Sequence, residues 1–408
     1  MTGPLEGIHV VECTQWAQGS SAGAMLGDLG ASVIKIENPQ GGDPARGMAQ
    51  MSQMRSSRTG QLDRNFFMEA FNRSKRSMAL DLRQEEGKKV AYKLIEGADV
   101  FLHNFRPDVP KRLGMDYETL CRYNPQIIYA EATGFGPEGP ERLKPGFENI
   151  AQAKTGWLYF AGGPETPPLW QVSGAGGDAI GAVITVVGIL ASLVARDRQG
   201  IGQRIDTSLV GSLIYLATSP FTARLLLGRE FPRRDREKVV NPLCNFYQCS
   251  DGGWVYLYML QADRYWHDFC RVTGIGHLEK DPKYVNLEAR NQNSEELIRV
   301  LDGIFATKPL PEWLELLEKG GDFIFGPIQT VSQAIEDPQI LANKYITDFD
   351  HPVFGPTKIV GVPYKFSKTP ATVTQAAPEL GEHTEEVLLE AGYTWEDIAD
   401  LKDKGIIP

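Results

Sequence analysis

The sequence predicts an α/β protein that has a mostly parallel sheet and a second, smaller α+β domain. Two observations lead to this prediction. Strand and helix signals alternate through the first half of the chain, and the strand segments are short and mostly apolar, which is typical of strands covered on both faces. A chain of 408 residues also exceeds the size of one ordinary hydrophobic core. We therefore expect two domains.

The alternation starts close to the N-terminus. Residues 8–13 (IHVVEC) predict a buried strand, 20–29 a helix that Gly30 ends, and 31–36 a second strand followed by Glu37. The same signals continue with a helix at 85–96, strands at 99–103 and 126–132, a long apolar helix at 179–197, a strand at 205–207 and a helix at 208–227. Such alternation places strands side by side in parallel, with helices on both faces of the sheet.

The second half of the chain has a different pattern. The basic run 229–238 indicates a linker, and residues 247–260 predict a hairpin around Asp251-Gly252-Gly253. Short helices follow to about residue 317. In the tail, GVPYKF at 361–366 predicts a strand and 384–391 and 395–404 predict helices, which would return the chain to the first domain.

Charge and cysteine content exclude several classes of protein. The net charge of −10 argues against a nucleic-acid partner, so an anionic ligand needs a local basic pocket. Five cysteines without CxxC spacing indicate reduced thiols in a cytoplasmic protein, with no disulfide and no metal site. The N-terminus has no signal-peptide pattern. The longest apolar run, 179–194, is shorter than a membrane span and predicts a core helix.

Two local motifs suggest chemistry. The first strand–helix–strand unit with Glu37 is reminiscent of dinucleotide sites, but its turn, TQWAQGSSAG, lacks G-x-G-x-x-G spacing, which argues against a nicotinamide or flavin enzyme. The second motif, SGAGGDAIGAVITVVGILASL, places Asp178 at the start of the long helix. There the helix dipole stabilises an anion, and free amides of the first turn could hold an oxyanion. From position alone, a simple N-cap is the more common role.

A series of ordered blocks covers nearly the whole chain. They are PLEGIHVVECT at 4–14, GASVIKIENPQGGDPAR at 30–46, NRSKRSMALDL at 72–82, ADVFLHNFRPDVPKRLGMDYETL at 98–120, NPQIIYAEATGFGPEGP at 124–140, KPGFENIAQAKTG at 144–156, GDAIGAVITVVGILASL at 177–193, GQRIDTSLV at 202–210 and LGEHTEEVL at 380–388. With these blocks the sequence resembles the class III CoA-transferases, the family of formyl-CoA transferase and of the carnitine and bile-acid CoA-transferases.

The resemblance implies a fold and an activity. The fold is a Rossmann-like large domain, residues 1–225 and 335–408, with a small α+β domain at 226–334, in an interlocked homodimer or a heteromer. The activity is transfer of coenzyme A from an acyl-CoA to a carboxylic acid, with coenzyme A as a cosubstrate and no tightly bound cofactor. Asp178 would attack the thioester to form an anhydride and then an aspartyl-CoA thioester.

The resemblance also implies site residues. Glu148 corresponds to a second active-site carboxylate. The positions that resemble CoA contacts are Leu80, Arg83, Asn104, Phe105, Arg112, Leu113, Lys144 and Phe147, although solvated surface cations are the alternative for the basic ones. The pattern of the formyl-CoA enzyme is broken at Gln15, Ala17 and Asn38, and its tetraglycine loop has no counterpart before Asp251. The contacts and the active-site cover at those places cannot be carried over.

Two other functions and the substrate stay open. An α-methylacyl-CoA racemase would need a histidine where the chain has Phe147 and an acid near Leu260-Gln261-Ala262. A non-catalytic CoA-binding subunit would not need to retain Asp178 and Glu148. Aromatic residues that could line an acyl pocket favour a medium-sized, aromatic or branched acyl group over formate and oxalate; they are Trp16, Trp157, Tyr159, Phe160, Trp170, Phe246 and Tyr247.

Overall fold

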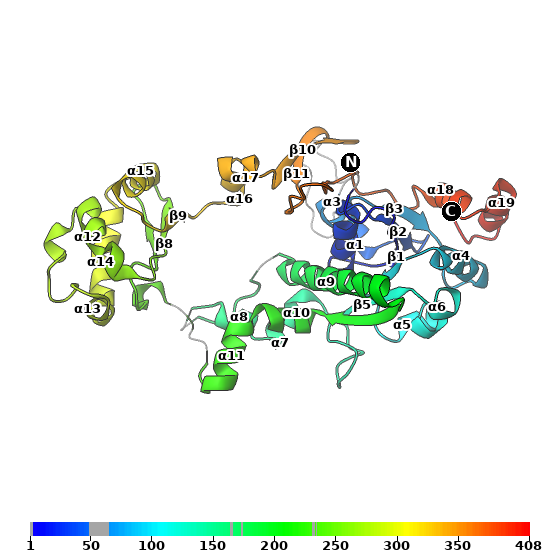
Figure 1. Cartoon of the computed structure of the whole chain (residues 1–408), viewed down its shortest axis with the longest axis horizontal. Coiled ribbons are helices and arrows are strands. Elements are labelled where there is room, and N and C mark those ends of the chain that lie inside the picture. The colour runs from blue at the N-terminus through cyan, green and yellow to red at the C-terminus, as the bar shows by residue number, and fades with distance from the viewer. Residues whose placement is uncertain (1–2, 49–64, 164–165, 173, 231–232, 234) are drawn as a thin grey trace. The chain divides into compact units, whose positions relative to one another are not determined.

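The computed structural model describes residues 3–48, 65–163, 166–172, 174–230, 233 and 235–408, and these fall into two compact units (Figure 1). Unit 1 comprises residues 1–158, 170–230 and 344–408. Unit 2 comprises 159–169 and 231–343. The predicted domain bounds differ from these units at three places: 159–169 and 335–343, predicted for the large domain, fall in unit 2, and 226–230, predicted for the small domain, falls in unit 1.

Unit 1 is built on a six-stranded, fully parallel sheet. In spatial order the strands are β3 (Arg76–Ala79), β2 (Ser32–Glu37), β1 (His9–Cys13), β4 (Val100–His103), β5 (Ile128–Thr133) and β6 (Gln203–Ser208). The strand order reverses between β1 and β4, as it does in Rossmann-type sheets, where ligands bind outside the carboxyl ends of the strands at this switch point. The predicted α/β class is confirmed.

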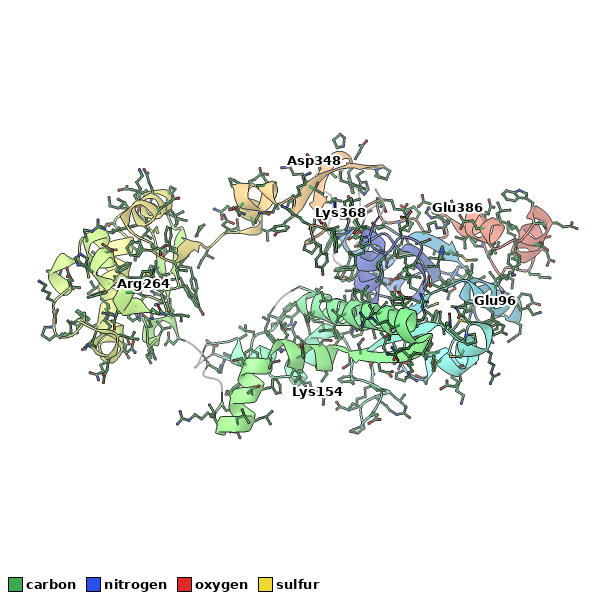
Figure 2. All side chains as sticks on the ribbon, in the orientation of Figure 1. Glu96, Lys154, Arg264, Asp348, Lys368 and Glu386 are labelled. Atoms are coloured by element: carbon green, nitrogen blue, oxygen red, sulfur yellow. The ribbon has the colours of Figure 1, made fainter. Side chains whose placement is uncertain are left out.

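Helices cover both faces of the sheet. On one face lie α1 (Gln18–Asp28) and α9 (Gly176–Gln199); on the other lie α4 (Glu85–Glu96), α6 (Tyr117–Tyr123), α18 (Thr384–Glu390) and α19 (Trp395–Asp403). Successive strand residues point to opposite faces, so Val10 packs with α1 and α9 whereas Val11 packs with α4 and α6. Charged side chains such as Glu96, Lys154 and Glu386 project from the surface of unit 1 (Figure 2).

Helix α9 is longer than predicted, 24 residues instead of 179–197. Its length and composition would allow it to cross a membrane. However, Ala182, Val186, Ile189 and Leu193 are buried in the core between α9, α1 and the sheet. The predicted role as a core helix fits this packing.

The prediction of one continuous helix at 208–227 is wrong. The segment forms two helices, α10 (Leu209–Leu216) and α11 (Thr218–Leu227), which bend by 74°. Pro220 has no N–H to donate, so it is tolerated in the first turn of α11 but not inside a continuous helix. This part of the chain also contains the helices α3 (Phe66–Asn72), α5 (Val109–Leu113), α7 (Glu148–Lys154) and α8 (Trp157–Phe160), the last of which ends in unit 2.

The C-terminal segment also differs from the prediction. Strands β10 (Ile346–His351) and β11 (Gly355–Val360) form an antiparallel hairpin, whereas 361–366 contains no strand. Pro363 in that segment cannot donate to a strand ladder.

The LGEHT motif at 380–384 covers the open edge of the large sheet. Ser77 of β3 exchanges hydrogen bonds with His383, and Thr384 Oγ1 accepts from the amide of the β3 residue Ala79.

Unit 2 contains a three-stranded antiparallel sheet and helices. The strands are β7 (Phe246–Gln248), β8 (Trp254–Leu257) and β9 (Phe325–Pro327), and β7 and β8 form the predicted hairpin. The helices are α12 (Ala262–Thr273), α13 (Leu287–Gln292), α14 (Ser294–Phe305), α15 (Leu310–Gly320), α16 (Val331–Ala334) and α17 (Pro338–Ala342). Trp313, Phe305 and Tyr247 are buried in its core.

Candidate active site

Asp178 lies in the first turn of α9. The N-cap of this helix is Ala175, which has a left-handed backbone (φ 64°) and no side-chain capping bond. Asp178 is therefore the third residue of the helix, and the interpretation of Asp178 as a plain N-cap is wrong. Its carboxyl is at the positive end of a long helix dipole, as predicted.

Glu148, the first residue of α7, lies directly against Asp178. Glu148 is 6% exposed, and its carboxyl hydrogen bonds that of Asp178. Burial, followed by the charge of Glu148 and this hydrogen bond, raises the pKa of Asp178 to about 7. Two carboxyls in contact cannot both be ionised at low cost, so the pair holds one proton near neutral pH.

The backbone and one side chain hold Glu148 in place. Glu148 Oε1 accepts from the amide of Gly177 (2.8 Å) and from Gln152 Nε2. A Cβ at position 177 would lie 2.9 Å from Glu148 Cγ, so the close approach requires glycine. The amide of Gly177 is thus occupied by Glu148, which corrects the expectation that it is free to hold an oxyanion.

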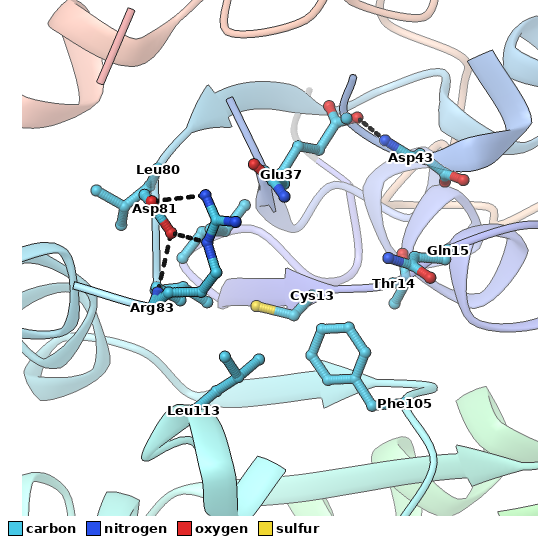
Figure 3. Close-up of a pocket in the computed structure, with 14 residues that line it drawn as sticks. Cys13, Thr14, Gln15, Glu37, Asp43, Leu80, Asp81, Arg83, Phe105 and Leu113 are labelled. Carbon is cyan, nitrogen blue, oxygen red and sulfur yellow. Dashed lines mark hydrogen bonds and ion pairs between the residues drawn. The ribbon is translucent and has the colours of Figure 1, made fainter. Parts of the chain in front are cut away.

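A pocket opens at the switch point of the sheet. Its cavity measures about 180 Å³ and lies where the chain leaves β1, β2, β3 and β4. It is lined by Cys13, Thr14, Gln15, Ile36, Glu37, Asn38, Gly42, Asp43, Leu80, Asp81, Leu82, Arg83, Phe105 and Leu113. Figure 3 shows Phe105 and Leu113 across the pocket from Leu80 and Arg83, with Cys13 between them. Four of the eight predicted CoA contacts therefore meet in one cavity.

Comparison with known proteins identifies the family. The sequence model described as CoA-transferase family III matches residues 5–384. The chain belongs to CoA-transferase family III. It is 31% identical to the (R)-2-hydroxy-4-methylpentanoate CoA-transferase of Clostridioides difficile and 32% identical to a formyl-CoA:oxalate CoA-transferase of Streptomyces coelicolor, each match covering 99% of both chains. A solved CAIB/BAIF family protein from Brucella suis superposes with a TM-score of 0.83 at 29% identity, covering 96% of this chain and 100% of that one.

The other predicted contacts of this family III CoA-transferase lie outside the pocket lining. Asn104 Nδ2 donates to the carbonyl of Gln15, and its Oδ1 accepts from the amide of Gln15, so Asn104 shapes the pocket wall. Phe147 contacts Trp16 edge-on, with ring centroids 5.8 Å apart. Since Trp16 follows Gln15 and Phe147 precedes Glu148, this contact connects the pocket to the carboxyl pair.

The two predicted cations outside the pocket lining, Arg112 and Lys144, are on the surface. The side chain of Arg112 is 70% exposed and lies 3.9 Å from Asp108, and that of Lys144 is 62% exposed and bonds Glu141. Neither lines the pocket. Both have the geometry of the solvated-cation alternative, although a long, exposed chain also suits contact with a phosphate at the rim.

Glu37, considered above as a ribose ligand, has a structural role. Its carboxylate accepts from Arg46, from Ser77 Oγ and from the amide of Asp43. Burial opposes ionisation, but the hydrogen bonds from Arg46 and the charge of Lys35 outweigh it and lower the pKa of Glu37 to about 2. A carboxylate engaged in this way is a poor ligand for a ribose, which further weakens the dinucleotide hypothesis.

Some residues at the site were not predicted. Gln152 was missed because its role depends on two segments, α7 and the turn before α9, that come together only in the fold. Cys13, Thr14 and Asp81 line the pocket because they lie at or just after the carboxyl ends of β1 and β3. The rule that ligands bind at the switch point of a parallel sheet could have predicted them. Among the candidate acyl-pocket residues, Trp16 lies beside the site, whereas Tyr247 packs inside the core of unit 2.

Proposed function

We propose that this CoA-transferase works through covalent intermediates on Asp178. An ionised Asp178 attacks the thioester carbonyl of the acyl-CoA donor, the C–S bond breaks, and an acyl-aspartyl anhydride and CoA thiolate result. The thiolate attacks the aspartyl carbonyl, which releases the donor acid and leaves an aspartyl-CoA thioester. The acceptor carboxylate then attacks this thioester, and the displaced thiolate cleaves the new anhydride to form the product acyl-CoA and regenerate Asp178.

The carboxyl pair supports this proposal. Asp178 is partly buried in the first turn of α9, where the helix dipole favours its anion, yet burial, followed by the charge of Glu148 and its hydrogen bond, raises its pKa to about 7. A carboxylate with that pKa is more basic than an ordinary aspartate and so a better nucleophile toward a thioester. When Asp178 attacks, Glu148 can accept the proton through the existing hydrogen bond.

We assign part of coenzyme A to the pocket at the switch point. Leu80, Phe105 and Leu113 offer apolar walls, and Arg83 offers a cation that already pairs with Asp81. Asn104 holds the Gln15 backbone at the pocket, and Phe147 contacts Trp16 beside Glu148. In this assignment the exposed Arg112 and Lys144 contact phosphates of coenzyme A. Replacing Phe105 with alanine should weaken CoA binding about tenfold, because an apolar wall is lost. Val353→Ala, an exposed truncation in the same unit, is the control for calorimetric titration with CoA.

The acyl group is proposed to be medium-sized and branched or aromatic. The C. difficile relative acts on a branched hydroxy acid by its name, whereas the S. coelicolor relative is named for formyl-CoA and oxalate at the same level of identity. The apolar contact of Trp16 with Phe147 beside Glu148 favours the larger group. We further propose a cytoplasmic homodimer.

Mass spectrometry of the intact protein tests the covalent mechanism. The chain is incubated with a panel of acyl-CoA donors, quenched, and digested for peptide mapping. We expect a mass gain of acyl or CoA size on the peptide that contains Asp178, and no gain in Asp178→Asn. An adduct on another residue, or turnover that persists in Asp178→Asn, would refute the proposal. No adduct with any donor would favour the racemase or the non-catalytic subunit.

A further inference from the structure

The buried side chain of Gln152 lies beside the carboxyl pair of Asp178 and Glu148. It lies one helical turn after Glu148 on α7 and is 2% exposed. Both ends of its amide are used. Gln152 Nε2 donates to Glu148 Oε1. Gln152 Oε1 accepts from the amide of Val172 at 3.2 Å, and Val172 belongs to the segment that leads to α9. The Gln152 side chain therefore contacts the carboxyl pair and the entry to the helix at the same time.

We propose that Gln152 is a positioning residue that keeps Glu148 ionised, so that Asp178 carries the proton shared by the two carboxyls. The placement of the proton stands on the hydrogen bonds alone, whereas its consequence for catalysis rests on the proposed nucleophilic role of Asp178. Gln152 acts through Glu148, the carboxyl to which its amide donates, and not on the reacting atoms themselves.

The hydrogen-bond donors around Glu148 indicate which of the two carboxyls carries the proton. Glu148 Oε1 accepts from two N–H groups, those of Gln152 and Gly177. N–H donors stabilise a carboxylate much more than a neutral carboxyl, because charge-assisted hydrogen bonds are about twice as strong as neutral ones. The remaining bond of the pair then has Asp178 as the donor and Glu148 as the acceptor. Without the Gln152 donor, the proton should move toward Glu148.

Other charged groups near α9 are already paired with one another. Those on the elements packed against this helix form ion pairs of their own, which are Lys154 with Glu141, Glu131 and Asp206 with Arg204, and Asp28 with Arg73. On α10, Tyr215 is exposed. Among the described residues, Glu148 is the charged group that acts on Asp178. The hydrogen bonds to Glu148 thus decide where the proton lies.

Carbodiimide labelling can locate the proton without any CoA chemistry. Carbodiimides activate protonated carboxyls, and a small amine then marks them for peptide mapping. At pH 6 to 7 the wild-type chain should be labelled mainly at Asp178. In Gln152→Met, which keeps the side-chain volume but has no N–H donor, the ratio of label at Asp178 to label at Glu148 should fall by about tenfold or more.

A second variant distinguishes the hydrogen bond from Gln152 to Glu148 from the hydrogen bond that Gln152 accepts from Val172. Val172→Pro removes the amide that Gln152 accepts from but leaves the bond from Gln152 to Glu148, so the label should stay on Asp178. If Gln152→Met does not fold, Gln152→Asn, which is one methylene shorter, withdraws the amide from Glu148 in the same way. Circular dichroism and melting temperature verify each fold.

Two results would overturn the inference. One is an unchanged labelling ratio in a folded Gln152→Met or Gln152→Asn. The other is a Val172→Pro variant that moves the label as far as Gln152→Met does, since this would assign the effect to the loop. A wild-type chain that forms no acyl or CoA adduct would refute the proposed mechanism but would leave the labelling result and its meaning intact. With the mechanism in place, Gln152→Met should also raise the rate of adduct formation at pH 6 relative to pH 8.

Discussion

Asp178→Asn should make the protein more stable as well as inactive. In the fold, the pKa of Asp178 is raised from 3.8 to about 7, so the native state holds a proton that the unfolded chain releases. The stability contributed by this group therefore falls as the pH rises from 4 to 7, and above 7 the ionised carboxyl is a constant penalty. The difference between these two pKa values corresponds to a penalty of at most about 4 kcal/mol. Because Asp178 is partly exposed, we expect about half of this, ~2 kcal/mol.

Asparagine removes the penalty because its amide is neutral at every pH and can still donate to Glu148. The difference in unfolding free energy between Asp178→Asn and wild type should be small at pH 5 and about 1–2 kcal/mol larger at pH 8. Thermal unfolding at both pH values measures this difference, with a rise in melting temperature of about 1–4 °C expected at pH 8. Asp197→Asn, at the exposed end of α9, is the matched control. A gap that is the same at both pH values, or a variant less stable than wild type at pH 8, would refute the reasoning.

Three further results are expected. Adduct formation should rise with pH through about 7, and Glu148→Gln should move this midpoint toward acid by on the order of one pH unit, because it removes the charge that opposes ionisation of Asp178; an unmoved midpoint would contradict this. Light scattering should give twice the mass of one chain, and Leu226→Glu, at a side chain that is 78% exposed on α11, should give monomers; a monomeric wild type would exclude the homodimer. Gly181→Ala should lower the unfolding free energy by about 1–3 kcal/mol, since a Cβ there would lie 2.9 Å from Nε2 and 3.0 Å from Cγ of the buried Gln18 side chain on α1. Gly303→Ala, whose Cβ would meet no atom within 4 Å, should be neutral or stabilising, and equal effects would contradict the packing argument.

Most of the parallel sheet could be predicted because its strands are buried on both faces. Residues 8–13 and 31–36 are short and mostly apolar, and they correspond to β1 and β2. Strand β3 was missed because it begins with polar residues, Arg76 and Ser77. It is an edge strand, and the LGEHT motif more than 300 residues later covers its open side. Such long-range cover leaves no local pattern in the sequence.

The candidate site also has features that the local sequence predicts and features that depend on the fold. The position of Asp178 at the start of a helix could be read from the sequence because a glycine-rich turn before an apolar run is a local signal. That Asp178 is not the cap depends on the left-handed backbone of Ala175, which no residue preference predicts for alanine. The grouping of Leu80, Arg83, Phe105 and Leu113 depends on the switch point, which is a property of strand order and not of any one segment.

Under the proposed mechanism, the carboxyl pair explains how Asp178 can hold a proton in the resting enzyme and act as a nucleophile once it is ionised. An aspartate with an ordinary pKa would be ionised at all times and weakly basic, whereas one fully buried would stay protonated. Asp178 lies between these limits, because the dipole of α9 favours its anion while partial burial and Glu148, held by Gly177 and Gln152, oppose it. An arriving thioester replaces water around the pair and brings a carbonyl that the ionised form can attack. Small changes in the hydrogen bonds of Glu148 should therefore change reactivity at Asp178 more than substitutions that remove contacts to coenzyme A alone.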